Sequence, residues 1–479
     1  MPVVLCNCGD CNMRRSLLVW LVAAHGLLIS AATQSWSAYA FTSIADSSGA
    51  FLDFNTPSVN SSGQVAFRAS LDNGGGGVYR GQGGALTTIA ETGSTYQGFQ
   101  YQTPGIDANG NVAFTAVRRP EGGGGEGVFI GNGPSTTIHI LTPTTTAPQP
   151  GDFAGAAAVV MNDEGTPAFA GAFVGPPLQG IRAGLYVGTA LVANDFGAFA
   201  SFADSLGRGL DVNNHNAVVF KAARDDNSSG IFVVGAGGLA TIADTSSGDF
   251  ASFNFSVPAI NDAGDIIFWA EPQPFVDALF TSSAAGGGQP LVFLDGSGPF
   301  AHFGKSPAIN NLGQIAFDAF LDGTGVGNGI FTGMDPSSDA VVFYGDPLFN
   351  SSLATATVSN QSINEAGQIA FHYVLANGLS GIGLATPLPQ GDSADFDGDQ
   401  DVDGADLLIW QRGVAAGTGS AATGDANGDH DVNGQDLAIW KQQFGQANLA
   451  APVPEPAAWW GALSMGLWAA AAARRERCA

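Results

Sequence analysis

The stretch that decides the fold is Asn60-Ser61-Ser62-Gly63-Gln64-Val65-Ala66-Phe67, a polar turn that runs into an apolar segment. Asn60 suits the first position of a tight turn, because its side chain can cap the turn. Gly63 can adopt the positive φ that follows a type I turn. After the turn, Val65 and Phe67 alternate with Ala66 and Arg68, which is the two-residue period of a β-strand.

This phrase recurs seven times at intervals of about 50 residues, and repeats of that length are typical of propellers and solenoids. The copies begin at Asn60, Asp107, Asn162, Asn213, Asn261, Asn310 and Asn364. A second phrase follows each copy, such as Gly77-Val78-Tyr79, and usually a third, such as Leu239-Ala240-Thr241-Ile242-Ala243-Asp244. With the segment that leads into the turn, each repeat supplies four short strands. The pattern therefore predicts an all-β fold, a seven-bladed β-propeller.

The ends of the repeat region favour a closed ring. The seventh repeat stops after its second phrase, and the missing third phrase stands before the first repeat as Thr42-Ser43-Ile44-Ala45-Asp46. An open β-solenoid, the alternative fold, does not need a displaced terminal strand. The copies resemble the NxxGxxAF tandem repeat of "choice-of-anchor" surface proteins, over residues 41–386. Asp107, Val219 and Ile267 depart from that pattern, and the resemblance implies no established activity.

Residues 389–446 have a different character, because acidic residues recur there at fixed spacing. The predicted metal ligands are Asp395, Asp397, Asp399, Asp401, Asp403 and Asp406 in one loop, and Asp425, Asn427, Asp429, Asp431, Asn433 and Asp436 in the other. Oxygen ligands spaced through a 12-residue loop suit Ca²⁺, so two calcium sites are predicted. Gln400 and His430 stand at the sixth position, where glycine is usual, and this departure leaves the affinity open. Each loop leads into an apolar helix start, Leu407–Trp410 or Leu437–Trp440.

The paired loops resemble a type I dockerin, in which two loop-helix halves are related by pseudo-twofold symmetry. The resemblance implies a cohesin-like binding partner, for which the tenth and eleventh loop positions help to choose; here these are Gly404-Ala405 and Gly434-Gln435. The alternative is a purely structural calcium clip between the repeats and the tail.

Both ends of the chain read as sorting segments. Arg14-Arg15, an apolar run and Ala38-Tyr39-Ala40 predict a signal peptide over residues 1–40, cut after Ala40. After a linker at 447–453, residues 454–479 contain Pro454-Glu455-Pro456, an uncharged 17-residue segment and a basic end, which predicts a short transmembrane sorting helix. This tail resembles the PEP-CTERM sorting signal, which implies processing by an exosortase-type protease. We therefore expect the protein to contact the membrane only through the signal peptide and the sorting segment.

Charge and composition bound the function. The chain has 42 acidic and 16 basic residues, which argues against nucleic acid and anionic membranes as partners. No nucleophile, metallo-enzyme or phosphate-loop motif is present, and all four cysteines lie in the two sorting segments. Acids end several third phrases, and they read either as turn caps or as a ring that binds a cation or sugar; they are Asp46, Glu91, Asp244, Asp295 and Asp346.

The sequence thus predicts a non-catalytic exported protein of the cell surface, outer envelope or extracellular matrix. Its propeller would bind a ligand or partner, with a polysaccharide as one candidate. The alternative is a secreted polysaccharide-acting enzyme, since two carboxylates in one funnel can hydrolyse glycosides.

Overall fold

The computed structural model describes the chain from residue 39 to residue 445, with gaps. The described ranges are 39–100, 102–142, 152–175, 180–196, 199–202, 209–274, 276–284, 291–295, 298–322, 327–336, 338–388, 393–398, 401–415, 417, 419–428 and 431–445. The chain divides into two compact units, Met1–Pro387 and Leu388–Ala479. The predicted signal peptide, except for Tyr39 and Ala40, and the whole sorting motif around Pro454-Glu455-Pro456 lie outside the described residues.

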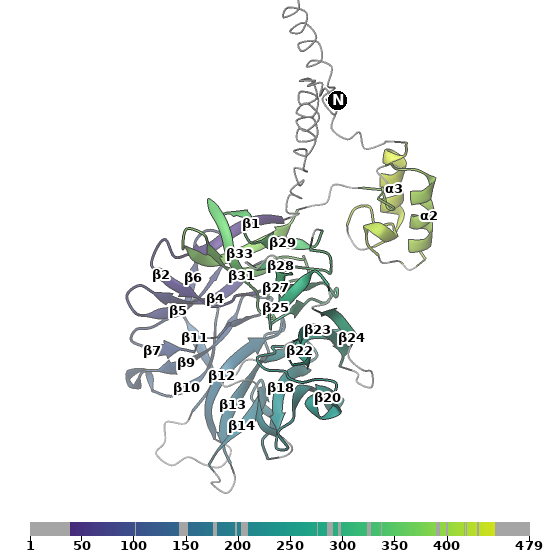
Figure 1. The fold of residues 1–479 in the computed structure, drawn as a ribbon. Helices are drawn as coiled ribbons and strands as arrows, with labels where there is room; N and C mark the ends of the chain where they lie inside the picture. The colour runs from purple at the N-terminus through teal and green to yellow at the C-terminus, as the bar shows by residue number, and fades with distance from the viewer. Residues whose placement is uncertain are drawn as a thin grey trace, which may run out of the picture. The chain divides into compact units, whose positions relative to one another are not determined.

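The first unit is a ring of seven antiparallel sheets, which confirms the predicted seven-bladed propeller (Figure 1). Blade 1 consists of β2 (Phe51–Phe54), β3 (Ser58–Val59), β4 (Val65–Leu71), β5 (Gly76–Gly81) and β6 (Thr87–Glu91). Blade 2 consists of β7 (Tyr96–Phe99), β8 (Gly105–Ile106), β9 (Val112–Arg118), β10 (Glu126–Gly131) and β11 (Thr136–Leu141), with the 3-10 helix η1 (Pro120–Gly122) between β9 and β10. Blade 3 consists of β12 (Phe153–Met161), β13 (Pro167–Val174), β14 (Ile181–Val187) and β15 (Ala190–Asn194).

The remaining four blades repeat this order. Blade 4 consists of β16 (Phe199–Phe202), β17 (Leu210–Val212), β18 (Val218–Arg224), β19 (Ser229–Gly235) and β20 (Gly238–Asp244), followed by the 3-10 helix η2 (Thr245–Ser247). Blade 5 consists of β21 (Ala259–Ile260), β22 (Asp265–Gln273), β23 (Val276–Ser283) and β24 (Leu291–Asp295). Blade 6 consists of β25 (Phe300–Phe303), β26 (Ala308–Ile309), β27 (Ile315–Leu321), β28 (Gly329–Phe331) and β29 (Ala340–Phe343). Blade 7 consists of β30 (Pro347–Leu348), β31 (Ser351–Thr357), β32 (Ile369–Leu375), β33 (Ser380–Pro387) and β1 (Tyr39–Asp46).

The first strand of the chain closes the ring, as the displaced third phrase predicts. Strand β1 pairs antiparallel with β33, from Tyr39 opposite Pro387 to Asp46 opposite Gly381, and the purple and green strands lie side by side in Figure 1. The pairing begins before the predicted cleavage point, because Ala40 already faces Thr386. Cleavage after Ala40 would leave the pairs from Phe41 onward, so the ring could still close.

The alternation after each turn builds the interfaces between blades. Phe67 packs on Ala370 of blade 7, whereas its neighbour Ala66 faces the other way and packs with Phe114 of blade 2. Ala66 leaves room for the aromatic cluster of the next blade, and Phe67 fills the space on the previous one. Seven apolar clusters of this kind lie between successive blades, including the pair formed by blades 7 and 1. Each buried phenylalanine stabilises its interface by about 1.5–3 kcal/mol.

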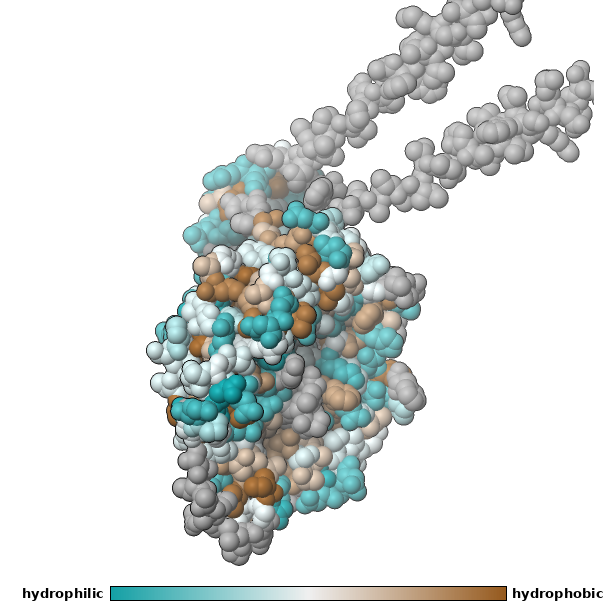
Figure 2. Space-filling model, turned by 90° about the vertical axis from the view of Figure 1, so that its left-hand side faces the viewer, coloured by the Kyte–Doolittle hydropathy of each residue, from teal (hydrophilic) through white to brown (hydrophobic). Residues whose placement is uncertain are grey.

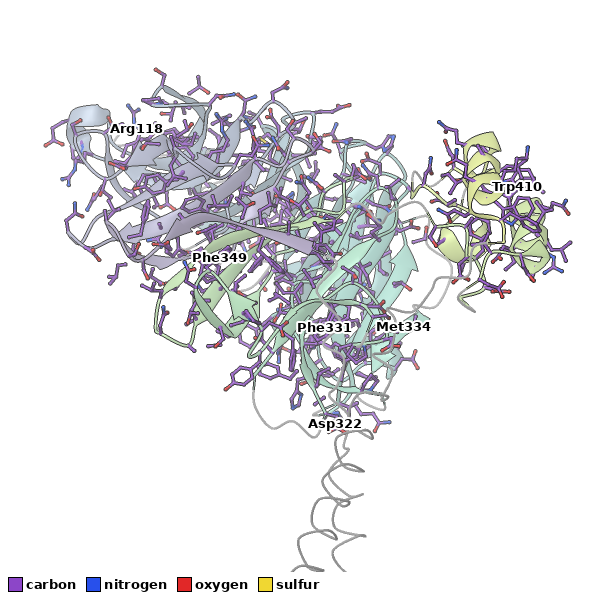
Figure 3. The ribbon with its side chains drawn as sticks, turned by 90° about the horizontal axis from the view of Figure 1, so that it is seen from above. Arg118, Asp322, Phe331, Met334, Phe349 and Trp410 are labelled. Atoms are coloured by element: carbon purple, nitrogen blue, oxygen red, sulfur yellow. The ribbon has the colours of Figure 1, made fainter. Side chains whose placement is uncertain are left out.

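An aromatic pair that precedes the turn completes five of the seven clusters, and sequence reasoning missed it. Phe51 and Phe54 are three residues apart, so a regular strand would point them to opposite faces. A register shift between Phe51 and Asp53 inserts an extra residue, and both rings then lie against Phe67. The pair recurs as Tyr96/Phe99, Phe199/Phe202, Phe250/Phe253 and Phe300/Phe303. Figure 3 marks Phe331, which closes the corresponding cluster of blade 6.

The described part of the second unit contains two short helices, α2 (Gly404–Gly413) and α3 (Gly434–Gln443), and the 3-10 helix η3 (Ala421–Thr423). Its core of Ala394, Phe396, Val402 and Ala426 is far smaller than any core of the propeller. Within the described ranges, no helix is long and apolar enough to cross a membrane.

The face shown in Figure 2 is mainly hydrophilic or neutral, with hydrophobic residues in separate patches. Most aromatic side chains that the sequence assigns to strands are buried, as predicted.

Candidate functional site

The first asparagine of each repeat caps its own turn, as predicted. The Oδ1 atom of Asn60 accepts hydrogen bonds from the backbone N–H groups of Ser62 at 3.1 Å and Gln64 at 2.9 Å. Gly63 has a φ of 73°, and Asn216, which replaces glycine in the fourth copy, has a φ of 60°. These values explain why glycine or asparagine stands at the fourth position.

The same asparagines also join neighbouring blades, which the sequence analysis did not foresee. Each Nδ2 atom donates to the backbone carbonyl of the first residue in the next copy: Asn60 to Asp107 (2.9 Å), Asn162 to Asn213 (3.0 Å), Asn213 to Asn261 (3.0 Å), Asn261 to Asn310 (3.1 Å), Asn310 to Asn364 (2.8 Å) and Asn364 to Asn60 (2.9 Å). We call this set of side chains the amide belt. It runs around the channel and crosses from the last copy back to the first.

Asp107 breaks the belt, because a carboxylate has no N–H to donate. Its oxygens accept instead from the backbone of Asn109 and Asn111 and from the side chain of Asn111. At this junction the next blade is reached by a backbone bond, from the N–H of Ala108 to the carbonyl of Asp163. The aspartate therefore keeps the turn cap and gives up the cross-blade bond.

A cavity of about 90 Å³, here called the belt chamber, lies at this end of the channel. Its polar rim consists of Asp163, Asn214, Asp262, Asn311 and Glu365, which occupy the second position of their repeats. The carboxylate of Asp262 accepts a hydrogen bond from the backbone N–H of Asn214 at 2.7 Å. It also accepts from the side-chain amides of Asn214 at 2.8 Å and Asn311 at 2.9 Å. None of the described residues that line this chamber is basic.

The rim carboxyls influence one another. Burial raises the pKa of Asp163, and the charges of Asp262 and Asp107 raise it further. The pKa of Glu365 is raised by burial and by the charges of Asp163 and Asp262. Deeper in the chamber, burial raises the pKa of Asp211 to about 7, although it accepts hydrogen bonds from Ile260 and Gln361.

A turn of blade 7 divides the channel. Asn360 is buried and donates to the carbonyls of Leu210 at 2.9 Å and Pro258 at 3.0 Å. Gln361 donates to the carbonyl of Met161 and to Asp211, both at 3.1 Å. Because these bonds reach three other blades, the turn spans the axis. Asn360 lines the belt chamber on one side and a second cavity on the other.

The acids that end the third phrases act as turn residues. Asp46 accepts from the backbone and hydroxyl of Ser48, and Asp244 caps η2 through Ser246 and also pairs with Arg224 at 2.8 Å. Asp346 accepts from the N–H of Phe343. Glu91 binds the hydroxyl of Tyr79 instead. The side chain of Asp295 is outside the described residues, so four of the five acids have local partners.

The first predicted calcium loop brings its carboxylates together. Ligand oxygens of Asp395, Asp397 and Asp406 lie within 4.8 Å of one another, as do those of Asp401, Asp403 and Asp406. Among the described residues, these two sets are the only groups of three or more acidic, histidine or cysteine side chains close enough to share a metal ion. Asp399, Gln400, Asp429 and His430 lie outside the described residues.

The two loops match bond for bond. The N–H groups of Phe396 and Asp403 donate to the two oxygens of Asp406 at 2.7 and 2.8 Å. In the second half, Ala426 and Asn433 donate to Asp436 at 2.8 and 2.7 Å. Asp406 and Asp436 are completely buried at the starts of α2 and α3, where negative charge is favoured.

The two halves also hold each other symmetrically. The indole N–H of Trp410, marked in Figure 3, donates to the carbonyl of Asn433 at 2.8 Å, and that of Trp440 donates to the carbonyl of Asp403 at 2.9 Å. Each helix thus bonds to the last turn of the other loop. The two halves of the module therefore exchange equivalent hydrogen bonds.

The donor set fits calcium. The first loop offers only carboxylate oxygens at its side-chain positions, and Ca²⁺ prefers six to eight oxygen ligands. Gly398 and Gly428, at the fourth position of their loops, have φ values of 76° and 72°, and this positive φ lets the backbone of each loop turn. In the second loop, Asp425, Asn427, Asp431, Asn433 and Asp436 are described and would supply the equivalent oxygens. Two calcium ions would bridge carboxylates that otherwise repel one another.

Comparison with known proteins gives a family and distant structural likenesses. The model of "Family of unknown function (DUF7453)" matches residues 42–193 and 175–380. No curated protein is similar enough in sequence to match. An acylaminoacyl peptidase of Pyrococcus horikoshii is 10% identical with a TM-score of 0.44; the match covers 71% of this chain and 52% of the peptidase, so the chain spans about half its length.

Two lectins are also similar at this distance. The BP39L lectin of Burkholderia pseudomallei is 13% identical with a TM-score of 0.34, covering 69% of this chain and 98% of the lectin. The six-bladed fucose-recognising lectin of Aleuria aurantia is 14% identical with a TM-score of 0.31, covering 59% of this chain and 92% of the lectin.

Proposed function

The chain belongs to the DUF7453 family of unknown function, and from that premise we propose that it is a non-catalytic exported protein of the cell surface or extracellular matrix. Its propeller binds a ligand or partner, and its paired loops form a calcium-dependent adaptor similar to a dockerin. The signal peptide and the PEP-CTERM-like tail direct export and exosortase-type processing.

The bond-for-bond match of the two loops is the observation that carries this proposal. The buried carboxylates Asp406 and Asp436 hold the loop backbones in one arrangement, and further acids of the first loop lie close to Asp406. A core as small as Phe396, Val402 and their two alanine neighbours supplies little hydrophobic stabilisation. Calcium binding then contributes folding free energy, so the adaptor is formed only outside the cell where calcium is abundant.

The propeller suits binding because hydrogen bonds from neighbouring residues fix the orientation of its rim carboxylates. Asp262 is held by the side-chain amides of Asn214 and Asn311, as a fixed recognition group is, and Glu365 accepts from the N–H of Asn311. Fixed polar groups at a channel end confer specificity at low cost in conformational entropy.

A polysaccharide-acting enzyme remains the second candidate, and the belt chamber is the observation that favours it. Asp163 and Glu365 both have pKa values raised by burial and by neighbouring acids, which is how paired carboxyls are tuned for glycoside hydrolysis. In that case Glu365 would serve as the acid and a second carboxylate as its partner.

Purified full chain incubated with insoluble and soluble polysaccharides, in calcium and in chelator, separates the two candidates. Retention without new reducing ends supports the binding protein and identifies its ligand class. Release of reducing ends that disappears in Glu365→Gln, while Glu91→Gln stays active, supports the enzyme. If neither occurs, ligand binding by the propeller is restricted to proteins.

The adaptor and the sorting steps are tested separately. Calcium-dependent capture of a cohesin-like domain by the full chain, lost in Asp436→Asn, supports the adaptor; a chain that binds calcium but captures no cohesin supports the structural clip. Mass spectrometry of the exported protein should show an N-terminus at Phe41 and a tail cut near Pro454. An intact tail in the exported protein would contradict exosortase-type processing.

A further inference from the structure

The second cavity of the channel, here called the far chamber, is the larger of the two. It has a volume of about 270 Å³, against about 90 Å³ for the belt chamber. Residues of all seven blades line it: Thr56, Thr103, Val159, Leu210, Val257, Ser306 and Thr357 come from blades 1 to 7 in that order. The chamber therefore lies on the propeller axis, and the Asn360 turn forms its floor.

The lining is rich in groups that both donate and accept hydrogen bonds. Five hydroxyl side chains line the chamber, those of Thr56, Thr103, Ser306, Thr357 and Ser359, together with the amides of Gln102 and Asn360. The hydroxyls of Thr56 and Thr103 bond to each other at 2.7 Å, and that of Ser359 donates to the carbonyl of Pro57. Valine and leucine side chains also line the chamber, and polar groups beside apolar ones are typical of a small-molecule site.

The two charged residues of the far chamber restrict the class of ligand. Asp318 is buried, and burial raises its pKa to about 7, so near neutral pH its carboxyl is available as a proton donor as well as an acceptor. Lys305 directs its ammonium group over the ring of Trp269, 4.0 Å from the ring centroid, and towards the ring of Phe255 at 5.3 Å. A simple cation would be repelled by the positive charge of Lys305, and a simple anion would be repelled by Asp318 when it is ionised.

An uncharged polyhydroxylated ligand is repelled by neither Lys305 nor Asp318. Its hydroxyls can donate and accept, as those of the lining do, and a half-protonated Asp318 can bind a hydroxyl in either role. The apolar lining can contact the C–H face of a sugar ring. A zwitterion would require Asp318 to be fully ionised, which its burial opposes.

We propose that the far chamber binds one ring of a neutral saccharide, with Asp318, Ser306 and Asn360 as its polar contacts. This inference rests on the proposed binding function and gives it a location, on the opposite side of the Asn360 turn from the acidic rim. The far chamber is then a second binding site of the channel, distinct from the acidic rim of the belt chamber.

Saturation-transfer NMR of the full chain with glucose, galactose, mannose, fucose and N-acetylglucosamine, each alone, tests the proposal. We expect at least one sugar to give signals from one face of its ring. Ser306→Phe should weaken binding at least about tenfold because the new ring occupies the chamber, and Asp318→Asn should weaken it less. Thr137→Phe, which adds the same ring on the exposed strand β11, should bind as the unmodified chain does.

Thermal unfolding of each variant shows whether it is folded, and Asp318→Asn provides the test if Ser306→Phe is not. Absence of signal from every sugar, or signals that survive both chamber variants, would overturn the proposal. So would binding of free glycine in place of sugars. Polysaccharide retention by a chain whose chamber variants bind normally would leave the proposed function standing and move the site elsewhere.

Discussion

The propeller and the paired-loop module are both built from sequence repeats, but their repeated polar residues work in different ways. In the propeller, Asn261 bonds the backbone of the next repeat, so each blade completes its neighbour without any ion. In the module, ligand oxygens of Asp406 lie within 4.8 Å of those of Asp395 and Asp397 and of those of Asp401 and Asp403, and the buried Asp436 has the matching place in the second half. One unit is stabilised by apolar interfaces and an amide belt, and we propose that the other is stabilised by calcium. The comparison teaches that regular spacing of Asn or Asp identifies a repeat but not the partner of the repeated side chain.

Removal of calcium should produce the largest difference between the units. In chelator the helices α2 and α3 are expected to unfold, while the propeller is unchanged. Free calcium at a thousand times its dissociation constant adds about 4 kcal/mol to the stability of the module. Differential scanning calorimetry of the full chain should show two transitions, of which only one moves with calcium. An equal shift of both transitions would break the comparison.

Protons, rather than calcium, should act on the propeller. The folded pKa of Asp318 is about 7, against 3.8 for an ordinary aspartate, so the folded chain holds a proton that the unfolded chain releases. Its contribution to stability is therefore intact below pH 4 and is lost as pH rises towards 7, by up to about 4 kcal/mol.

Asp318→Asn removes this titration. The variant should match the unmodified chain in propeller stability at pH 4 and exceed it increasingly up to pH 7.5, as measured by urea unfolding at each pH. Asp72→Asn, at the exposed turn between β4 and β5, is the control. A stability difference that is constant with pH would show that Asp318 is ionised in the folded chain.

Loss of one belt member should weaken the propeller alone. Asn213→Ala removes the bond to the buried carbonyl of Asn261 and the turn cap to Ala217, and we expect a loss of about 3 kcal/mol. Asn213→Asp keeps the cap and loses the cross-blade bond, so its loss should be smaller. Urea unfolding measures both, and an aspartate variant as stable as the unmodified chain would show that the belt bond contributes nothing.

Repair of the belt should give the smallest effect. Asp107→Asn supplies the missing N–H donor for the carbonyl of Asn162. The side-chain amide of Asn111, which now donates to Asp107, must flip so that its oxygen accepts from the new amide. We expect a gain of about 1 kcal/mol in the free energy of unfolding of the propeller. Asn109→Asp in the same turn is the comparison variant. A loss of stability in Asp107→Asn would indicate that the break at blade 2 is itself stabilising.

Much of the fold could be predicted from the sequence because it depends on local patterns. The seven turns, the strand alternation after Gly63 and the displaced strand that begins near Thr42 are visible in one dimension, and the structure has all three. The cross-blade role of Asn60 could not be read in this way, because its partner, the carbonyl of Asp107, is a backbone atom. The only signal available was that Asp107 lacks a donor.

The channel was harder to predict than the blades. Asn360 and Gln361 bond to carbonyls and an acid more than 100 residues away, and no spacing rule connects them. Asp318 follows the phenylalanine of its repeat like any other strand residue, and its burial depends on how the blades close. The acids of the paired loops were readable, because all ligands of one ion come from a single 12-residue loop.

Calorimetric titration of the full chain with calcium tests the central claim most directly. The account predicts two bound ions, with Asp406→Asn and Asp436→Asn each removing one and the propeller transition left in place. A chain that binds no calcium, or two variants that still bind both ions, would contradict it.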